Sequence, residues 1–247
     1  MIATLPMYDR PEAAAAHDRF WALIRDHLGD APDALTRDAY HWVNPDLLLS
    51  QTCSLPYRTG LQEDVRIVAT PVHNLPCDAG MYYSVVLVRE DDPRDTLDAF
   101  AGARLAINSP VSQSGWAAID ELAHQGGIVF GSVFETGSHD ASARAVADQR
   151  ADLCAVDAVT WTMIERWDGF ASNLRVLCQT QPTPALPYVT AIERDPRPLQ
   201  EALLTAVQSL SPEDRDTLCL IDVTYIPPSF YVTLPIPPAP ALTAEFV

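Results

Sequence analysis

The sequence predicts an α/β protein with a largely parallel sheet, because strand-like and helical segments alternate along most of the chain. The apolar run from Tyr82 to Arg89 has the length and character of a strand buried on both faces. Two strand–loop–helix units then follow, from Arg104 to His124 and from Ile128 to Ala147. The length of 247 residues and the hydrophobic content of 48% allow one large domain or two compact α/β lobes.

The N-terminal part begins with a segment that is typical of a first strand and ends near Tyr8. A helix is expected next, with Asp9 placed to cap it and with Phe20, Ile24 and Leu28 on its apolar face. The turn residues Asn44-Pro45-Asp46 are expected to start a second helix that runs through Leu49, and Val65 to Thr70 to form a strand. These elements continue the alternation of strands and helices.

The C-terminal half is expected to hold a short strand at Ala151 to Val156, a helix around Val159 to Trp167 and a strand at Leu174 to Leu177. The prolines between residues 182 and 187 resist regular structure and suit a crossing between lobes. An amphipathic helix is expected at residues 198–210. Beyond residue 225 the many prolines predict an extended strap or a partly disordered tail.

The composition limits the kinds of partner. A net charge of −17, from 33 acidic and 16 basic residues, repels phosphate backbones and anionic membranes, so nucleic acid is not expected as a partner. No apolar run is long enough to span a bilayer, so membrane insertion is not expected. The first residues lack a basic segment followed by a long apolar one, which indicates a cytoplasmic protein or a periplasmic one supplied without its leader.

Motifs for metals, cofactors and catalysis are not found. The five cysteines are scattered and none lies in a CxxC or Cys/His pattern, so no zinc site is expected. The chain lacks Walker, GxGxxG, GxSxG and HExxH motifs, so no cofactor and no catalytic residue are assigned. Ser138 and His139 are neighbours, but adjacent residues on a helix do not face each other as a nucleophile and its base must.

Two predicted strand–loop–helix junctions place hydrogen-bonding side chains at the start of a helix: Asn108-Ser-Pro-Val-Ser-Gln-Ser-Gly-Trp116 and Thr136-Gly-Ser-His139. In an open α/β sheet such junctions lie at the carboxyl ends of strands, where ligands bind. Free backbone N–H groups and the helix dipole favour an anion there. Ser112, Ser114 and Ser138 can add hydroxyl donors, although a single serine there is usually an ordinary N-cap. Two such junctions in succession favour a site for a small anionic ligand.

Other polar residues have two readings each. His139 is as suited to a ligand contact as to a satisfied surface position, since imidazole donates readily to anions. Asp152 and Asp157 flank a short apolar strand, and one of them can cap the following helix. Asp157 can instead accept a hydrogen bond from a protonated ligand group. Tyr82, at the start of a strand, fits either the core or the wall of a cleft.

These segments resemble a known family, the phosphate, phosphite and phosphonate-binding proteins of ABC importers. The first junction resembles that family's N-x-P-x-S-x-S-G-aromatic loop, although Gln113 stands where a small hydroxyl residue is common. Gly137-Ser-His139, followed by Ala155-Val156-Asp157, resembles its G-x-H…D stretch, and Gly80-Met-Tyr82-Tyr-Ser84 its Tyr-x-Ser strand opening. The resemblance is good from about Gly80 to Trp161 and weak in the proline-rich tail.

The resemblance implies a two-lobed type II periplasmic-binding fold with mixed, mostly parallel sheets and a ligand in the cleft at the hinge. Lobe 1 is expected to comprise residues 1–83 plus 185–247, and lobe 2 residues 84–184. The ligand-binding residues that the resemblance and the local patterns imply lie in both lobes: Tyr8, Gln51, Thr52, Tyr82, Ser112, Gln113, Ser114, Ser138, His139 and Asp157.

The first functional hypothesis is a non-catalytic protein that binds a phosphonate or a related small oxyanion, for an ABC permease or as a sensor. The resemblance favours the periplasm, whereas the N-terminal sequence favours the cytoplasm. The second hypothesis is an enzyme on the same fold, similar to chorismate dehydratases or pyrimidine-precursor synthases, with His139 and Asp157 as its available acid and base. The third is a regulator that kept the fold and lost its ligand.

Overall fold

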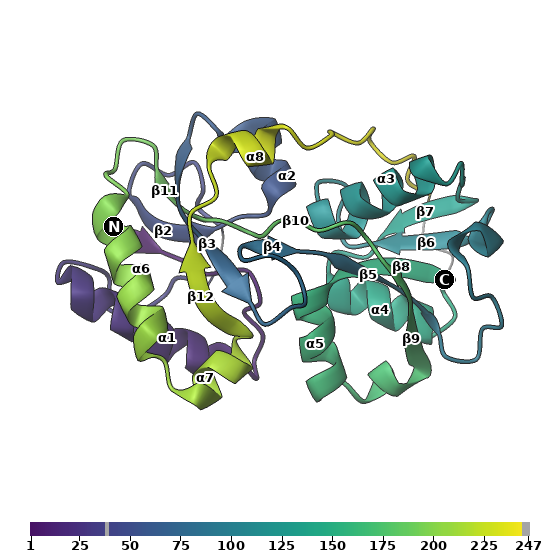
Figure 1. The fold of residues 1–247 in the computed structure, drawn as a ribbon, viewed down its shortest axis with the longest axis horizontal. Coiled ribbons are helices and arrows are strands. Elements are labelled where there is room, and N and C mark those ends of the chain that lie inside the picture. Colours follow the sequence, from purple (N-terminus) through teal and green to yellow (C-terminus); the bar gives the residue numbers. More distant parts are fainter. Residues whose placement is uncertain (38–39, 244–247) are drawn as a thin grey trace. The chain divides into compact units, whose positions relative to one another are not determined.

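The chain passes three times between two units in the computed structural model, which describes residues 1–37 and 40–243 (Figure 1). Unit 1 comprises Met1–Met81 and Pro184–Leu234, and unit 2 comprises Tyr82–Thr183 and the chain from Pro235 onward. The sequence places the tail in lobe 1, but the tail belongs to unit 2.

Unit 1 is built on a mixed sheet with the strand order β1-β2-β11-β3-β12. β1 is parallel to β2, whereas β11 is antiparallel to both β2 and β3, and β12 is antiparallel to β3. β2 and β3 therefore run in the same direction on either side of β11. The bounds of the strands are Ile2–Ala3 for β1, Leu47–Gln51 for β2, Val65–His73 for β3, Tyr188–Ala191 for β11 and Leu220–Thr224 for β12.

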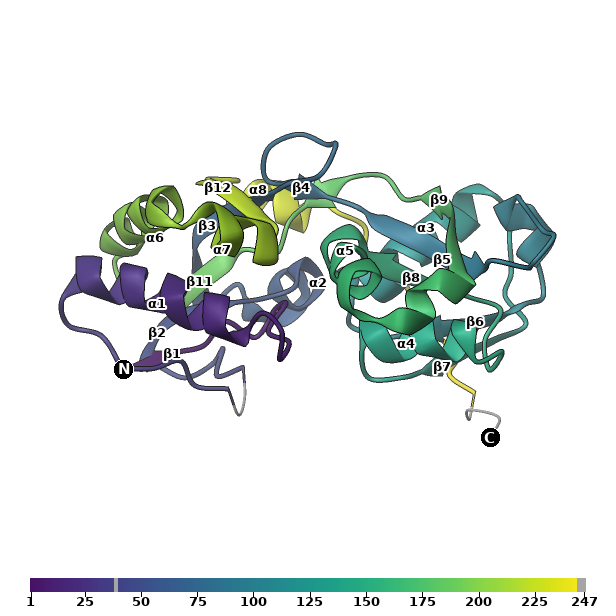
Figure 2. The ribbon, with the colours of Figure 1, turned by 90° about the horizontal axis from the view of Figure 1, so that it is seen from below.

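Helices cover the sheet of unit 1. One core joins the apolar faces of α1 and α6, through residues such as Phe20 and Leu203, to the sheet residues Leu49 and Val68. Figure 2 shows these two helices side by side. A second core joins Leu47, Ile67 and Val189 to Tyr57 and Tyr231, from the helical turns after β2 and near the end of the unit. The bounds are Ala14–Leu28 for α1, Ser54–Pro56 for α2, Tyr57–Leu61 for the π-helix η1, Arg197–Ser209 for α6, Pro212–Thr217 for α7 and Pro228–Val232 for α8.

The helix predicted from Asn44 through Leu49 is wrong, because Leu47–Gln51 is the strand β2. The residues Asn44-Pro45-Asp46 form a turn in which the Asn44 side chain accepts a hydrogen bond from the Asp46 N–H at 2.9 Å. All five residues of β2 are buried. A short apolar run buried on both faces has no helical or strand periodicity, so its spacing does not distinguish the two.

Unit 2 is built on a second mixed sheet with the order β7-β6-β8-β5-β9. β7, β6 and β8 are parallel, while β5 is antiparallel to β8 and β9 is antiparallel to β5. The mixed sheets agree with the predicted fold class, but the alternation of strands and helices predicts more parallel pairing than the structure has. That alternation constrains only strands joined by a crossover helix. The bounds are Ser84–Arg89 for β5, Arg104–Ile107 for β6, Ser132–Glu135 for β7, Leu153–Asp157 for β8 and Leu174–Gln179 for β9.

The helices of unit 2 lie on both faces of its sheet, with α3 on one side and α4 and α5 on the other (Figure 1). The α3 side is held by Trp116 and Ile119, which pack with Phe100, Ile107 and Val133. The bounds are Leu97–Phe100 for the 3₁₀-helix η2, Gln113–Ala117 for the π-helix η3, Ala118–Gln125 for α3, His139–Ala147 for α4, Ala158–Trp167 for α5 and Gly169–Asn173 for the 3₁₀-helix η4.

The segments at the unit boundaries have distinct structures. Met81–Tyr82 (β4) and Thr183–Pro184 (β10) pair as a two-stranded ribbon. The proline-rich segment therefore contains a short strand where the chain passes between the units. The tail forms an ordered strap on unit 2: the Trp116 indole donates to the Pro238 carbonyl at 3.0 Å, and Leu242 bridges Val133 in parallel. The sequence did not predict the short helix α8 before it. Within the described residues, no helix has the length and apolar character of a membrane span.

Candidate functional site

Polar side chains gather at one edge of the sheet of unit 2. Because β6, β7 and β8 are parallel, the residues at or just beyond their carboxyl ends, Asn108, Thr136 and Asp157, lie at the same edge. β5 runs the opposite way and begins there, with Ser84 directly opposite Asp157. Thr180, just after β9, accepts a hydrogen bond from the Ser84 N–H at 3.0 Å. The ends of all five strands therefore contribute to this edge.

Ser112 shapes the first junction at this edge. Its hydroxyl accepts a hydrogen bond from the Gly115 N–H at 3.0 Å, so it is an N-cap, and its carbonyl accepts from the Ala117 N–H, five residues on. This wide turn, η3, makes Gln113 and Ser114 the first helical residues. Isolated π-turns of this kind occur frequently at functional sites. Ser112, Gln113 and Ser114 are all buried.

Gly115 allows the first junction to approach its neighbours closely. A Cβ atom at this position would lie 1.8 Å from the Asn108 side-chain oxygen and 3.1 Å from Cε1 of His139. The first distance is far below van der Waals contact and the second is slightly below it, so any side chain here has to displace Asn108. Glycine thus allows η3 to pack directly against the ends of β6 and α4.

His139 is the first residue of α4 and stands at the centre of the cluster. Ser138 precedes it as the N-cap, accepting a hydrogen bond from the Ala141 N–H at 3.0 Å. The Nε2 atom of His139 lies 2.9 Å from the Ser114 hydroxyl, 3.5 Å from the Asn108 amide nitrogen and 3.5 Å from Oδ2 of Asp157. The structure thus brings together Ser114, His139 and Asp157, three of the residues predicted from the sequence.

Asp157 is held in place as the N-cap of α5. One carboxylate oxygen accepts a hydrogen bond from the Thr160 N–H at 2.9 Å, and the other accepts from the Thr160 hydroxyl. Asp152, the other candidate cap, instead pairs with Arg104 at 3.0 Å. The side chains of Asp157 and His139 are 4% and 13% exposed.

The imidazole of His139 is neutral at pH 7. Burial lowers its pKa from the usual value of 6.5, and the nearby carboxylate of Asp157 and the carbonyl of Ala155 oppose this effect without cancelling it. Nε2 and the Ser114 hydroxyl are in hydrogen-bond contact at 2.9 Å, and the hydroxyl donates when the neutral ring carries its proton on Nδ1.

The arrangement differs from a catalytic triad. In a triad the histidine uses one ring nitrogen for the nucleophile and the other for the carboxylate. Here the Ser114 hydroxyl and the Asp157 carboxylate both approach Nε2 of His139. Nothing in this geometry favours the enzyme hypothesis.

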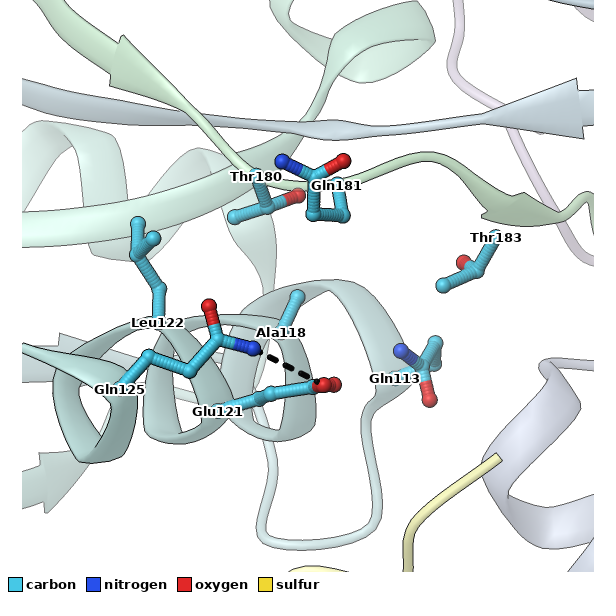
Figure 3. A pocket seen from close by; sticks show the side chains of 8 residues that line it. All are labelled: Gln113, Ala118, Glu121, Leu122, Gln125, Thr180, Gln181 and Thr183. Carbon is cyan, nitrogen blue, oxygen red and sulfur yellow. Dashed lines mark hydrogen bonds between the residues drawn. The ribbon is translucent and has the colours of Figure 1, made fainter. Parts of the chain in front are cut away.

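Gln113 lies apart from the His139 cluster, although it neighbours Ser114 in sequence. It lines a pocket with residues of α3 and of the segment after β9 (Figure 3). In this pocket the Gln125 amide donates to the Glu121 carboxylate at 3.3 Å. The lining residues are Gln113, Ala118, Glu121, Leu122, Gln125, Thr180, Gln181 and Thr183.

The predicted ligand-binding residues of unit 1 make contacts with other parts of the protein. The amide nitrogen of Gln51, at the end of β2, donates to the Leu186 carbonyl at 3.0 Å. The hydroxyl of Thr52 donates to the Cys53 carbonyl at 3.2 Å. Tyr8 has a positive φ of 65°, which is uncommon for a tyrosine, and its ring meets that of His73 edge to face at 5.4 Å. Tyr82 is buried at the boundary of unit 2.

The residues missed from the sequence are Asn108, Gly115 and Thr180. Asn108 and Gly115 belong to the quoted loop, so the signal was present, but their roles depend on a close approach that spacing does not reveal. Thr180 carries no local motif. Among the residues that the structure describes, no group of three or more His, Cys, Asp or Glu side chains is placed to hold a metal ion.

A comparison with protein families matches residues 2–228 of the chain to "ABC transporter, phosphonate, periplasmic substrate-binding protein". No curated protein sequence matches the chain.

Solved structures share the fold at low sequence identity. PhnD1 from Prochlorococcus marinus in complex with methylphosphonate is 15% identical, covers 94% of both chains and has a TM-score of 0.71. A binding-protein component of an ABC phosphonate transporter from Pseudomonas aeruginosa is 15% identical, covers 91% of this chain and 80% of its own, and has a TM-score of 0.71. XAC2383 from Xanthomonas citri, bound to chloride, is 14% identical, covers 95% of both chains and has a TM-score of 0.69. These likenesses establish the two-lobed binding-protein fold.

Proposed function

Because this chain belongs to the family of ABC-transporter phosphonate periplasmic substrate-binding proteins, we propose that its ligand is a phosphonate or a closely related small oxyanion. The observation that carries the proposal is the cluster at the edge of the sheet of unit 2. There the starts of η3, α4 and α5 meet around Ser114, His139 and Asp157. In this proposal the protein binds its solute and releases it unchanged.

The physical basis for anion binding is the set of donors at these helix starts. The first N–H groups of a helix have no partner within the helix, and its dipole is positive at that end. The Ser114 hydroxyl lies beside these groups and becomes a donor to a ligand once it turns from His139. Since backbone N–H groups and hydroxyls are placed in advance, an oxyanion needs no mobile cationic side chain to be held.

Each predicted residue has a proposed role. In unit 2, Ser114 and His139 contact the oxygens of the ligand, Ser112 holds the loop, and Ser138 holds the start of α4. Asp157 meets a hydroxyl or cationic part of the ligand. The remaining candidates are proposed as further ligand contacts: Tyr8, Gln51, Thr52, Tyr82 and Gln113.

The proposed partner is an ABC permease, and the proposed compartment is the periplasm. Both proposals rest on the family. The acidic surface, with a net charge of −17, is compatible with a soluble carrier that stays off anionic lipid.

The test is a thermal-shift and calorimetric screen with methylphosphonate, phosphite, phosphate, sulfate, methylsulfonate and acetate. A ligand that binds only the native state, at a hundred times its Kd, adds about 2.7 kcal/mol of stability. We expect a clear shift with a phosphorus oxyanion and at least a tenfold loss of affinity in Ser114→Ala.

The matched control is Ser172→Ala, an exposed serine of η4 in the same unit, whose hydroxyl donates to the nearby Gly169 carbonyl at 3.0 Å. It should bind like the wild type. If no oxyanion shifts the melting temperature, or if both serine variants bind equally well, the proposed site is wrong.

A further inference from the structure

Three side chains from three different segments of unit 2 approach one ring nitrogen of His139. The Ser114 hydroxyl is 2.9 Å from Nε2, and the Asn108 amide nitrogen and the Asp157 carboxylate are each 3.5 Å from it. In the neutral tautomer that carries its proton on Nδ1, Nε2 accepts hydrogen bonds, which the hydroxyl of Ser114 can donate. A protonated Nε2 donates, and the carboxylate of Asp157 can accept. The cluster therefore holds a partner for each protonation state of this nitrogen.

We propose that an oxyanion binds at this cluster together with one proton, which Nε2 of His139 takes up from solvent. The inference rests on the proposed function and deepens it. The bound oxyanion accepts a hydrogen bond from the Ser114 hydroxyl, which turns away from the imidazole. Nε2 then no longer receives the hydrogen bond from Ser114, and it lies next to the bound anion. A hydronium ion or buffer acid gives up a proton to it: the bond between that proton and the acid breaks, the Nε2–H bond forms, the conjugate base returns to solvent, and no covalent bond of the protein or the ligand breaks.

The free protein is poised for this uptake. Burial keeps the pKa of His139 below its usual value, so the ring is neutral at pH 7 before the ligand arrives. An anion at the site acts in the same direction as Asp157, since both negative charges stabilise the imidazolium. Burial strengthens this attraction because little water screens it.

The other charged groups near α4 already have partners elsewhere. Asp157 is the charged group that acts on the imidazole. Those on α4 itself and on the elements packed against it are engaged as follows: Arg144 with Asp140 and Asp168, Arg104 with Asp152, Arg89 with Asp91 and Asp92, Arg175 with the carbonyls of Asp92 and Arg94, Arg166 with the ring of Trp167, and Glu165 with Trp161.

The consequence is a pH dependence of affinity with a definite sign. The pKa of His139 is higher in the complex than in the free protein, so binding is favoured at lower pH. Between the two pKa values, affinity falls with rising pH by up to about tenfold per unit, the limit for one proton. The site thus binds the oxyanion and one proton together, and the proton on His139 offsets one negative charge of the ligand.

The primary test is NMR of the imidazole nitrogens in ¹⁵N-histidine-labelled protein at pH 7.5, with methylphosphonate as the probe. The His139 signals are assigned from their loss in His139→Asn. We expect a neutral ring protonated on Nδ1 without the probe, and a cationic ring at saturation. A ring that is cationic without the probe, or that stays neutral in the complex, overturns the inference while leaving the proposed function in place.

Calorimetry gives an independent readout. The binding enthalpy, measured in buffers with different ionisation enthalpies, reports the number of protons taken up. Because methylphosphonate itself titrates, the comparison is with His139→Asn, which should take up close to one proton fewer, and with His124→Asn, an exposed histidine of α3 that should match the wild type.

If His139→Asn no longer binds, the NMR result alone decides. If the wild type binds none of the oxyanions in the screen, the proposed function fails and this inference fails with it.

Discussion

Replacing Gly115 with alanine is a direct test of how the cluster in unit 2 is packed. The added methyl group would lie 1.8 Å from the Asn108 side-chain oxygen, 2.8 Å from its Cγ and 3.1 Å from Cε1 of His139. Asn108 has to move, and His139 has to yield slightly. Overpacking of this kind costs about 1–3 kcal/mol, and alanine recovers about 0.4–1 kcal/mol by restricting the unfolded chain.

The expected net loss for Gly115→Ala is therefore about 1–2 kcal/mol, or roughly 2–8 °C in melting temperature for a protein of this size. The matched control is Gly60→Ala. Gly60 also lies in a π-helix, has no positive φ, and its added methyl group would meet no atom within 4 Å. It should be unchanged or slightly more stable. Calorimetric scans of both variants without ligand make the comparison.

A double variant identifies the cause of the loss. Asn108→Ala removes the oxygen and Cγ that the new methyl group meets, so Asn108→Ala/Gly115→Ala should be more stable than the sum of the two single changes predicts. The coupling should be about 1 kcal/mol or more. The close packing around Gly115 is refuted if Gly115→Ala has the same melting temperature as Gly60→Ala. It is also refuted if the losses of stability from Asn108→Ala and Gly115→Ala simply add in the double variant.

Two further changes probe unit 2 away from His139. The pKa of Asp92 is lowered to about 2 by its hydrogen bonds to Arg94, so the carboxylate contributes stability that is complete above its unfolded pKa of 3.8 and is lost as pH falls towards 2. Acid unfolding of Asp92→Asn should be less steep between pH 4 and 2 than that of the wild type, with about 2 kcal/mol less stability at pH 7; equal pH profiles would contradict this. Trp116→Phe removes the indole donor to Pro238, which should cost about 0.5–1.5 kcal/mol, and the lost packing of the buried indole ring adds to this cost. It should also speed amide exchange at Thr243, and unchanged exchange would mean that the strap is held without this bond.

The sequence predicted the loops that meet at the cluster of unit 2 better than it predicted the contact that each of their residues makes. Turn and cap residues next to predicted strands indicated the helix starts at Ser112 and Ser138. Capping depends on neighbouring residues only, so it can be predicted from the local sequence. The contact between Ser114 and His139 joins residues 25 positions apart, and it depends on the order β7-β6-β8, which local spacing does not contain.

Two features show why other expectations stayed incomplete or failed. The amide of Gln51 was expected at the ligand, yet it donates to the Leu186 carbonyl, 135 residues away. No local pattern shows which backbone group needs a donor. The helix predicted from Asn44 through Leu49 is in fact a turn followed by the strand Leu47–Gln51. Every residue of this strand is buried, and complete burial removes the periodicity by which helix and strand are told apart.

The strap that returns to unit 2 has a practical consequence for measuring lobe motion. Ile2 pairs in the sheet of unit 1, whereas the Thr243 N–H donates to the Val133 carbonyl of unit 2 at 2.7 Å. Fluorophores attached beside these residues would each be anchored to a different unit, with neither lying within a loop of the ligand cluster. A change in energy transfer on adding ligand would report that the two units move relative to each other, and an unchanged signal would report that they do not, with no label inserted into either unit.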